Sequence, residues 1–371
     1  MTKTRLFEMS HQMKRRTFAT VIFAATLLLL SSAVQAQVEA PGVSSDQSVA
    51  QGAVIPPSPP AGFDARTASA VELELYGFPP APSVGTPEYS RWLSLVSPSI
   101  TRITPTLEQT VITNGSAQNV SIKAPAPGSN SVSTTSSNWS GYAQYGAAGT
   151  FKHNNDFVFA EWILPKAQQA FGTCDGTYWY SSQWVGFDGF GSGDVLQAGT
   201  ESDAYCSGGV TTTFYSAWYE WYPFNEVRVS LPVSGGDLMG SEVWYTTASP
   251  YGHAFIVDYT NQNSISIAFN PPPGTVYKGN SVEWVEERPG INGGLANLTN
   301  YVADPFNFDY ARAGGKTYYA GVSPGGTTVY SISMTCPPWS PSSSCKSTTK
   351  ISIPSLYGTE TLWLYNYAPS F

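Results

Sequence analysis

From Asn138 onward, hydrophobic and aromatic residues alternate with polar ones in short runs. Most runs have the length of a strand and are rich in β-branched or aromatic side chains, and Gly, Pro, Asn or Ser separates them. Examples are FVFAEWILP, TTFYSAWYEWYP, HAFIVDYT, SISIAFN and SVEWVEE. About twelve to fourteen strands, with no helical stretch of note, predict an all-β sandwich of two sheets over residues 131–371. A hairpin is expected around residues 260–263.

The first 36 residues have the pattern of an export signal. Three basic residues, Lys14 to Arg16, precede an apolar run from Phe18 to Leu30, and Val34 to Ala36 fits a small-residue cleavage site. The run is shorter than the roughly 20 residues that a spanning helix needs. Residues 1–36 are therefore predicted to be a signal peptide, and the protein to be secreted, either extracellular or periplasmic.

Residues 37–130 differ in composition from the chain that follows. Their first part is rich in Pro, Ser, Ala and Gly, which is typical of disorder. A short helix is expected to begin at Thr86-Pro87-Glu88. Residues 114–136 again have the composition of a linker. We expect residues 37–130 to be a pro-segment with a linker; a flexible spacer is the alternative.

Composition and charge exclude some function classes. The chain is 42% hydrophobic but only 12% charged, and its net charge is −8. A basic stripe that could bind nucleic acid is absent, which argues against that partner. With the signal peptide removed, no membrane association is expected, and the domain is predicted to be a monomer.

Four cysteines in an exported protein suggest two disulfides, for which three pairings are possible. The choice that is local in sequence joins Cys174 to Cys206 and Cys336 to Cys345. A metal site is the weaker interpretation, because there is no C-x-x-C motif and the chain holds only three histidines. Neither a metal nor a cofactor is expected.

Several common catalytic motifs are missing. There is no G-x-S-x-G sequence, and His153 and His253 are the only histidines beyond the leader, so a Ser or Cys triad has few partners. The Asp-Thr-Gly and Asp-Ser-Gly motifs of pepsin-like proteases are also absent. Any catalysis is therefore expected to use carboxylates, amides and hydroxyls.

Five motifs, in this order, carry a resemblance to a known family: NWSGY, WVGFDG, VLQAG, AWYEWYP and VEWVEERP. Together they resemble the glutamic peptidases, or eqolisins, over residues 138–289. The resemblance implies a concanavalin A-like sandwich of two antiparallel sheets, polypeptide substrates and a catalytic Gln/Glu pair. The family's glutamine matches Gln197, and its glutamate matches Glu287.

Elementary chemistry agrees with this pair. Peptide hydrolysis needs a base that activates water and a donor that stabilises the developing oxyanion. A carboxylate with a pKa near 4.3 can act as a base in mild acid, and an amide donates hydrogen bonds at any pH. We expect Glu287 to be the general base and later the acid, and Gln197 to orient the water and polarise the carbonyl.

Two neighbouring glutamates are rivals of Glu287. Strand alternation places Glu283 on the face of Glu287. It places Glu286 on the other face, where this side chain is expected to point outward. Glu283 therefore stays a candidate for the same site. A nearby arginine, Arg288, is expected to lower the pKa of Glu287.

The resemblance also implies a set of substrate-binding residues. They are Trp139, Trp184, Asp188, Glu220 and Tyr222. Aromatic residues on strands belong to the core about as often as to a cleft, and Asp188 or Glu220 could instead be a buried, hydrogen-bonded acid.

Two other functions compete with peptide hydrolysis. A β-glycosidase could use Glu283 and Glu287, but their Cα atoms would be roughly 13 Å apart in a regular strand. Retaining enzymes place the two carboxyl groups about 5–5.5 Å apart. The second alternative is a carbohydrate-binding module with exposed Trp and Tyr platforms.

Overall fold

The structure is a computed structural model that describes residues 52–170, 173–336, 350–359 and 361–366. The predicted signal peptide, residues 1–36, lies outside the described residues. Two helices are present in the described chain, α1 (Ala70–Leu75) and α2 (Pro87–Leu95). No helix of the described chain is long and apolar enough to span a membrane.

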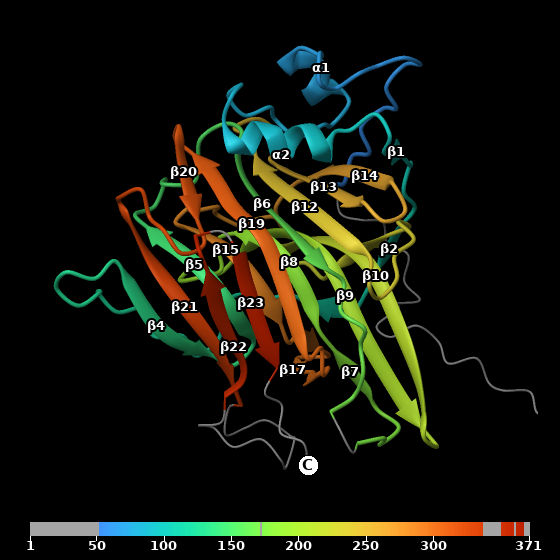
Figure 1. Cartoon of the computed structure of the whole chain (residues 1–371), viewed down its shortest axis with the longest axis vertical. Helices are drawn as coiled ribbons and strands as arrows, with labels where there is room; N and C mark the ends of the chain where they lie inside the picture. The colour runs from blue at the N-terminus through green and yellow to red at the C-terminus, as the bar shows by residue number, and fades with distance from the viewer. Residues whose placement is uncertain (1–51, 171–172, 337–349, 360, 367–371) are drawn as a thin grey trace, which may run out of the picture. The chain divides into compact units, whose positions relative to one another are not determined.

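Strands make up most of the rest (Figure 1). Before residue 130 they are β1 (Thr101–Arg102), β2 (Leu107–Gln109) and β3 (Ile112–Thr113). After it they are β4 (Ser131–Ser136), β5 (Trp139–Gly146), β6 (Asp156–Ile163), β7 (Tyr178–Tyr180), β8 (Ser182–Phe187), β9 (Val195–Ser207), β10 (Val210–Tyr222), β11 (Val227–Val229), β12 (Leu238–Tyr245), β13 (Gly252–Asp258), β14 (Asn263–Phe269), β15 (Ser281–Glu287), β16 (Gly290–Ile291), β17 (Gly294–Leu295), β18 (Asn297–Leu298), β19 (Ala303–Ala313), β20 (Lys316–Tyr319), β21 (Thr327–Thr335), β22 (Lys350–Tyr357) and β23 (Thr361–Asn366).

The strands form two layers, as the sequence predicts. One layer runs β21–β5–β15–β8–β9–β10–β11, and the other runs β14–β13–β12–β6–β19–β23, all with antiparallel neighbours. β22 pairs with both β21 and β23, so hydrogen bonds join the two layers into one sheet that folds over on itself. The predicted hairpin is confirmed, because β13 and β14 are joined by residues 259–262.

The core lies between the layers. β8 and β9 contribute Val185, Leu196 and Ala198, and the facing layer contributes Val158 and Ile256, all fully buried. These residues alternate with polar ones along each strand, so one face of β8 and β9 fills the core. The other face of the same strands carries Trp184 and Gln197.

The N-terminal segment (residues 52–130) packs on the sandwich through both helices and strands. Thr86 caps α2 by accepting a hydrogen bond from the Tyr89 amide at 3.2 Å, with Pro87 in the first turn, as predicted. Leu95 of α2 packs against Phe255 of β13, on the outer face of its layer. β1 pairs with β14 and β2 pairs with β11, so the segment extends both layers.

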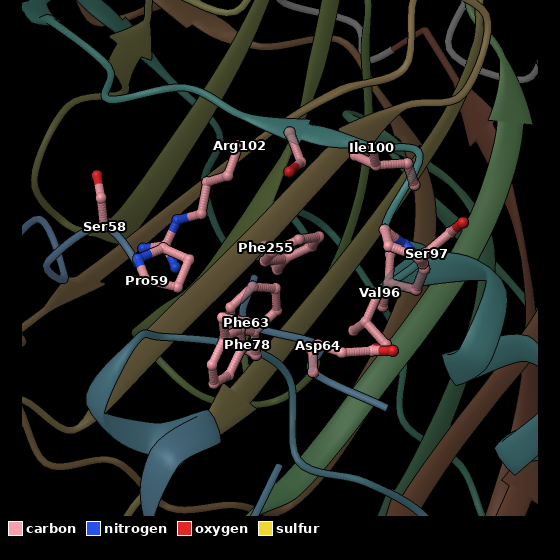
Figure 2. A pocket seen from close by; sticks show the side chains of 14 residues that line it. Ser58, Pro59, Phe63, Asp64, Phe78, Val96, Ser97, Ile100, Arg102 and Phe255 are labelled. Carbon is pink, nitrogen blue, oxygen red and sulfur yellow. The ribbon is translucent and has the colours of Figure 1, made fainter. Parts of the chain in front are cut away.

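A pocket of about 250 Å³ lies under this segment (Figure 2). Phe63, Phe78 and Arg102 of the segment face Phe255 of the sandwich there. All the lining residues except Phe255 and Ser264 belong to residues 58–102. The pocket therefore exists only while the segment is in place, and it does not include Gln197 or Glu287.

The predicted disulfide between Cys174 and Cys206 is present and ties the loop before β7 to the end of β9. The second predicted pair cannot be followed, because Cys345 lies outside the described residues. We expect the Cys174→Ser/Cys206→Ser double variant to lose about 3–4 kcal/mol of unfolding free energy, since the bridge closes a loop with a sequence separation of 32. Urea denaturation at pH 4 measures the difference, and an unchanged midpoint would refute it.

Candidate active site

Glu287 ends β15, which lies between β5 and β8. Its cross-strand neighbours are Trp139 on β5 and Ser182 on β8. Every residue of β15 is buried, so both faces of this strand are covered. Glu286 therefore does not point outward, as alternation alone led us to expect: it is fully buried on the opposite face and accepts hydrogen bonds from Gln183 Nε2 at 3.0 and 3.1 Å.

Gln197 lies on β9, opposite Gly186 of β8 and Glu220 of β10. Directly paired residues of neighbouring strands share a face of the sheet. Following the pairing from β15 through β8 to β9 places Gln197 on the same face as Glu287. Both side chains are fully buried.

Four N–H groups donate hydrogen bonds to the Glu287 carboxylate. Asn138 Nδ2 and the backbone amide of Gly115 donate to Oε1, at 2.9 and 3.0 Å. The indole Nε1 atoms of Trp139 and Trp184 donate to Oε2, both at 3.0 Å. Such donors stabilise the ionised form of a carboxylate and do not themselves titrate in acid.

Burial acts in the opposite direction and dominates. It raises the pKa of Glu287 well above 4.5, and the hydrogen bonds from Asn138, Trp184, Gly115 and Trp139 offset part of the rise. Arg288, which is predicted to lower this pKa, is not among the leading causes of the shift, and burial lowers the pKa of Arg288 itself to about 10.

Gln197 and Glu287 meet at one peptide bond. Gln197 Nε2 donates a hydrogen bond to the carbonyl oxygen of Asn114, and the next amide, Gly115 N–H, is the donor to Glu287. The carbonyl oxygen and the amide nitrogen belong to the same peptide group. The two side chains, far apart in sequence, therefore bracket a single amide (residues 114–115).

This contact corrects the prediction that residues 114–136 are a linker. Asn114 is fully buried, and Ser131–Ser136 form β4, which pairs in parallel with β21. Asn138, a donor to Glu287, lies in the NWSGY motif but is not among the predicted site residues. Short polar residues next to glycine look the same in a solvated linker and in a bound extended segment, so composition held no signal for this contact.

Four of the five predicted substrate-binding residues surround the same amide. Trp139 and Trp184 hold Glu287, while Glu220 Oε2 accepts the Asn114 amide hydrogen at 2.9 Å. The ring of Tyr222 lies over Gly115, where an added methyl group would be 3.3 Å from its Cε2 atom.

Asp188, the fifth, serves a different purpose. Its carboxylate accepts hydrogen bonds from the backbone amides of Lys278, Gly279 and Asn280 at 2.7 to 2.9 Å. It therefore fixes the chain that leads into β15, as the buried, hydrogen-bonded acid that was its alternative interpretation. Asp188 also has a φ of +65°, which suits the turn after β8.

A cluster of buried acids lies behind Asn114. Its members are Glu201, Asp203, Glu220 and Glu226, with Arg228 as their counter-ion at 3.5 Å from Glu226. Burial and mutual repulsion raise the pKa values of Glu201, Glu220 and Glu226 well above 4.5. Within the described chain, no three acids, histidines or cysteines are arranged to hold a metal ion.

Comparison with protein families matches residues 137–353 to the family described as Peptidase A4. The match covers more than half of the chain and includes both β9 and β15. The chain belongs to the peptidase A4 family. Within this A4 match lie Asn138, Trp139, Trp184, Gln197 and Glu287; Asn114 and Gly115 lie outside it.

Similar proteins include other peptidases. Aspergillopepsin-2 of Aspergillus niger is 30% identical over 154 residues, which are 41% of this A4 family chain and 51% of that protein. The chain thus spans about half the length of this curated relative. A solved structure of scytalidoglutamic peptidase with a peptide-based transition state analogue is 23% identical, covering 62% of this chain and 98% of that one, with a TM-score of 0.46. SCP-B, an eqolisin solved with the tripeptide Ala-Ile-His, is 22% identical over the same shares, with a TM-score of 0.44.

Proposed function

We propose that this chain is a secreted endopeptidase that hydrolyses polypeptides in acid, with Glu287 as general base and Gln197 as oxyanion donor. The observation that carries the proposal is the pair of hydrogen bonds that the two side chains make to one peptide group, one to its oxygen and one to its nitrogen. Membership of the A4 family supports the same reaction. The export pattern of residues 1–36 and the Cys174–Cys206 disulfide support secretion.

The geometry suggests a role for each group during hydrolysis. Gln197 Nε2 lies at the carbonyl oxygen, where negative charge develops as water attacks, and it can donate there at any pH. Gln197 Oε1 is buried and has no hydrogen-bond partner in the described chain, so it is available to orient the water. The base is the ionised form of Glu287, which is the minor form in acid because burial raises the pKa of this carboxyl group. In that form Glu287 takes the proton of the water and then returns it to the amide nitrogen, which lies 3.0 Å from its Oε1 atom.

Two competing functions receive less support. Glu283 has Asp188 and Asp194 as electrostatic neighbours, whereas Glu287 is held by the two indoles, so the two acids have different surroundings. Trp139 and Trp184 are fully buried, and a stacking platform for carbohydrate needs exposed rings.

The proposed function is tested by digestion of casein between pH 2 and pH 5 in the presence of pepstatin, which excludes pepsin-like contaminants. We expect fragments from the wild-type chain and none from Gln197→Ala. Release of reducing sugar from a β-glucan without casein cleavage would overturn the proposal in favour of a glycosidase.

A milder change tests the electrostatics of the base. Trp184→Phe removes one of the two indole donors from Glu287 Oε2 and keeps a large aromatic ring. A hydrogen bond to a charged group favours its ionised form, so the loss of this donor should raise the pKa of Glu287 further. Because the base must be ionised, the acidic limb of the kcat/KM profile should move to higher pH. An unshifted limb would contradict the assignment of the base.

A further inference from the structure

The chain that runs through the site is held in the manner of a bound peptide. Before the amide, β2 pairs with β11 and β3 pairs with β16, both antiparallel. After it, the Ala117 amide donates to the Gly189 carbonyl at 3.1 Å, and the Gln118 amide donates to Asn138 Oδ1 at 2.8 Å. Addition of an extended segment to strands of a receptor, with pockets for its side chains, is a general mode of peptide recognition.

The residues on either side of the central amide fit their surroundings. Asn114 is fully buried, and its Nδ2 atom donates to Glu226 at 3.2 Å and to Glu220 at 3.4 Å. The carbonyl oxygen of Gly115 accepts from Trp139 Nε1 at 2.9 Å, so this indole binds both the segment and Glu287. A methyl group added at position 115 would lie 3.3 Å from Tyr222 Cε2, a close contact that the ring would relieve by moving a few tenths of an ångström.

We propose that the chain hydrolyses its own Asn114–Gly115 bond, and that residues 112–118 block the cleft until this bond is cut. This proposal rests on the proposed function, and adds to it the internal substrate and the position of activation. The cut lies upstream of the boundary at residue 130 that composition predicts. It would separate the part of the N-terminal segment that carries α1, α2, β1, β2 and β3 from the domain, and leave residues 115–130 attached to β4.

The reaction consumes one water molecule. Its oxygen bonds to the carbonyl carbon of Asn114, and Glu287 takes one of its protons while Gln197 stabilises the oxyanion. The C–N bond then breaks, and Glu287 delivers the proton to the nitrogen of Gly115. The products are a carboxyl group at Asn114 and an amino terminus at Gly115. The new carboxyl group would lie beside Gln197 and Glu220.

The test uses the full chain, purified at pH 7 and shifted to pH 4. N-terminal sequencing and intact mass should show a new terminus that begins GSAQNV, at Gly115, and casein cleavage should rise as this species accumulates. Glu287→Gln should leave the bond intact. Spontaneous breakage of an Asn-Gly bond would persist in that variant and would refute self-cleavage.

Gly115→Pro removes the backbone N–H that donates a hydrogen bond to Glu287, and it should make the bond between residues 114 and 115 resistant to cleavage. We expect at least a tenfold slower appearance of a new terminus and of casein cleavage. Ala126→Pro is the matched control, because Ala126 is exposed and lies between two prolines in the same segment, and it should be processed like the wild type.

The two proposals fail in different ways. If the wild-type chain digests casein while every molecule stays intact between residues 114 and 115, or carries a terminus elsewhere, self-cleavage at this bond is refuted and the proposed function stands. If neither casein nor its own segment is cut at any acidic pH, both are refuted. The wild-type measurement alone decides between these outcomes, even if a proline variant fails to fold.

Discussion

Glu287→Gln is expected to lower kcat/KM for casein-derived peptides by about 10³-fold or more, with little change in fold. The substitution keeps the shape of the side chain but removes the base, and positioned general acid–base groups contribute about 10²–10⁴-fold each. Because Glu287 acts first as the base and later as the acid to the leaving amine, the loss of activity should lie near the upper end of this range. The initial rates of wild type and variant at pH 4 measure it.

Glu283→Gln is the matched control. Glu283 lies on the same strand and the same face as Glu287, and it is equally buried. Burial is the largest cause of its raised pKa, followed by a hydrogen bond from Ser281 and the charge of Asp188. We expect its activity within about threefold of wild type. A loss as large as that of Glu287→Gln would instead show that both acids serve one site.

The free energy of unfolding is expected to be greatest near pH 4 and to fall by at least about 4 kcal/mol by pH 8. Burial raises the pKa values of Asp194 and Asp203 to about 7 and that of Asp304 to about 8, from a usual value of 3.8. Between the usual pKa of 3.8 and these raised values, the folded chain keeps protons on these carboxyl groups that the unfolded chain has lost. Stability is therefore fully present below about pH 4 and is lost as the pH rises through 7 to 8.

Urea denaturation of Glu287→Gln from pH 3 to pH 8 measures this without self-digestion. Asp304→Asn should make the curve shallower above pH 6, because one of the groups that must ionise is then absent. Exposed Asp64, whose partner Arg66 holds its pKa at about 2, supplies the comparison: Asp64→Asn should leave the slope above pH 4 unchanged. Stability that rises from pH 4 to pH 8 would contradict the expectation.

Local patterns predicted much of this molecule. Alternation gave most strands and the hairpin that joins β13 and β14, and the Thr86-Pro87 sequence gave the start of α2. These features depend on residues that are near one another in the chain. The sequence-local disulfide between Cys174 and Cys206 succeeded for the same reason.

The errors lie where distant segments meet. Alternation correctly assigned Glu286 to the face opposite Glu287, but it cannot tell whether a second layer covers that face. Residues 114–136 have few apolar side chains, so nothing in their composition records that Asn114 is buried against Glu220. Their binding depends largely on backbone groups, which every residue possesses.

The strands of the N-terminal segment have a consequence for the processed protein. β1 and an isolated bridge at Val54 pair with β14, and β2 pairs with β11. Removal of residues 52–114 would leave β14 and β11 each with one unpaired side, where backbone N–H and C=O groups can recruit another chain. Activation would thus turn a protected chain into one that can associate through its open edges, and the segment would act as an intramolecular guard against aggregation during export.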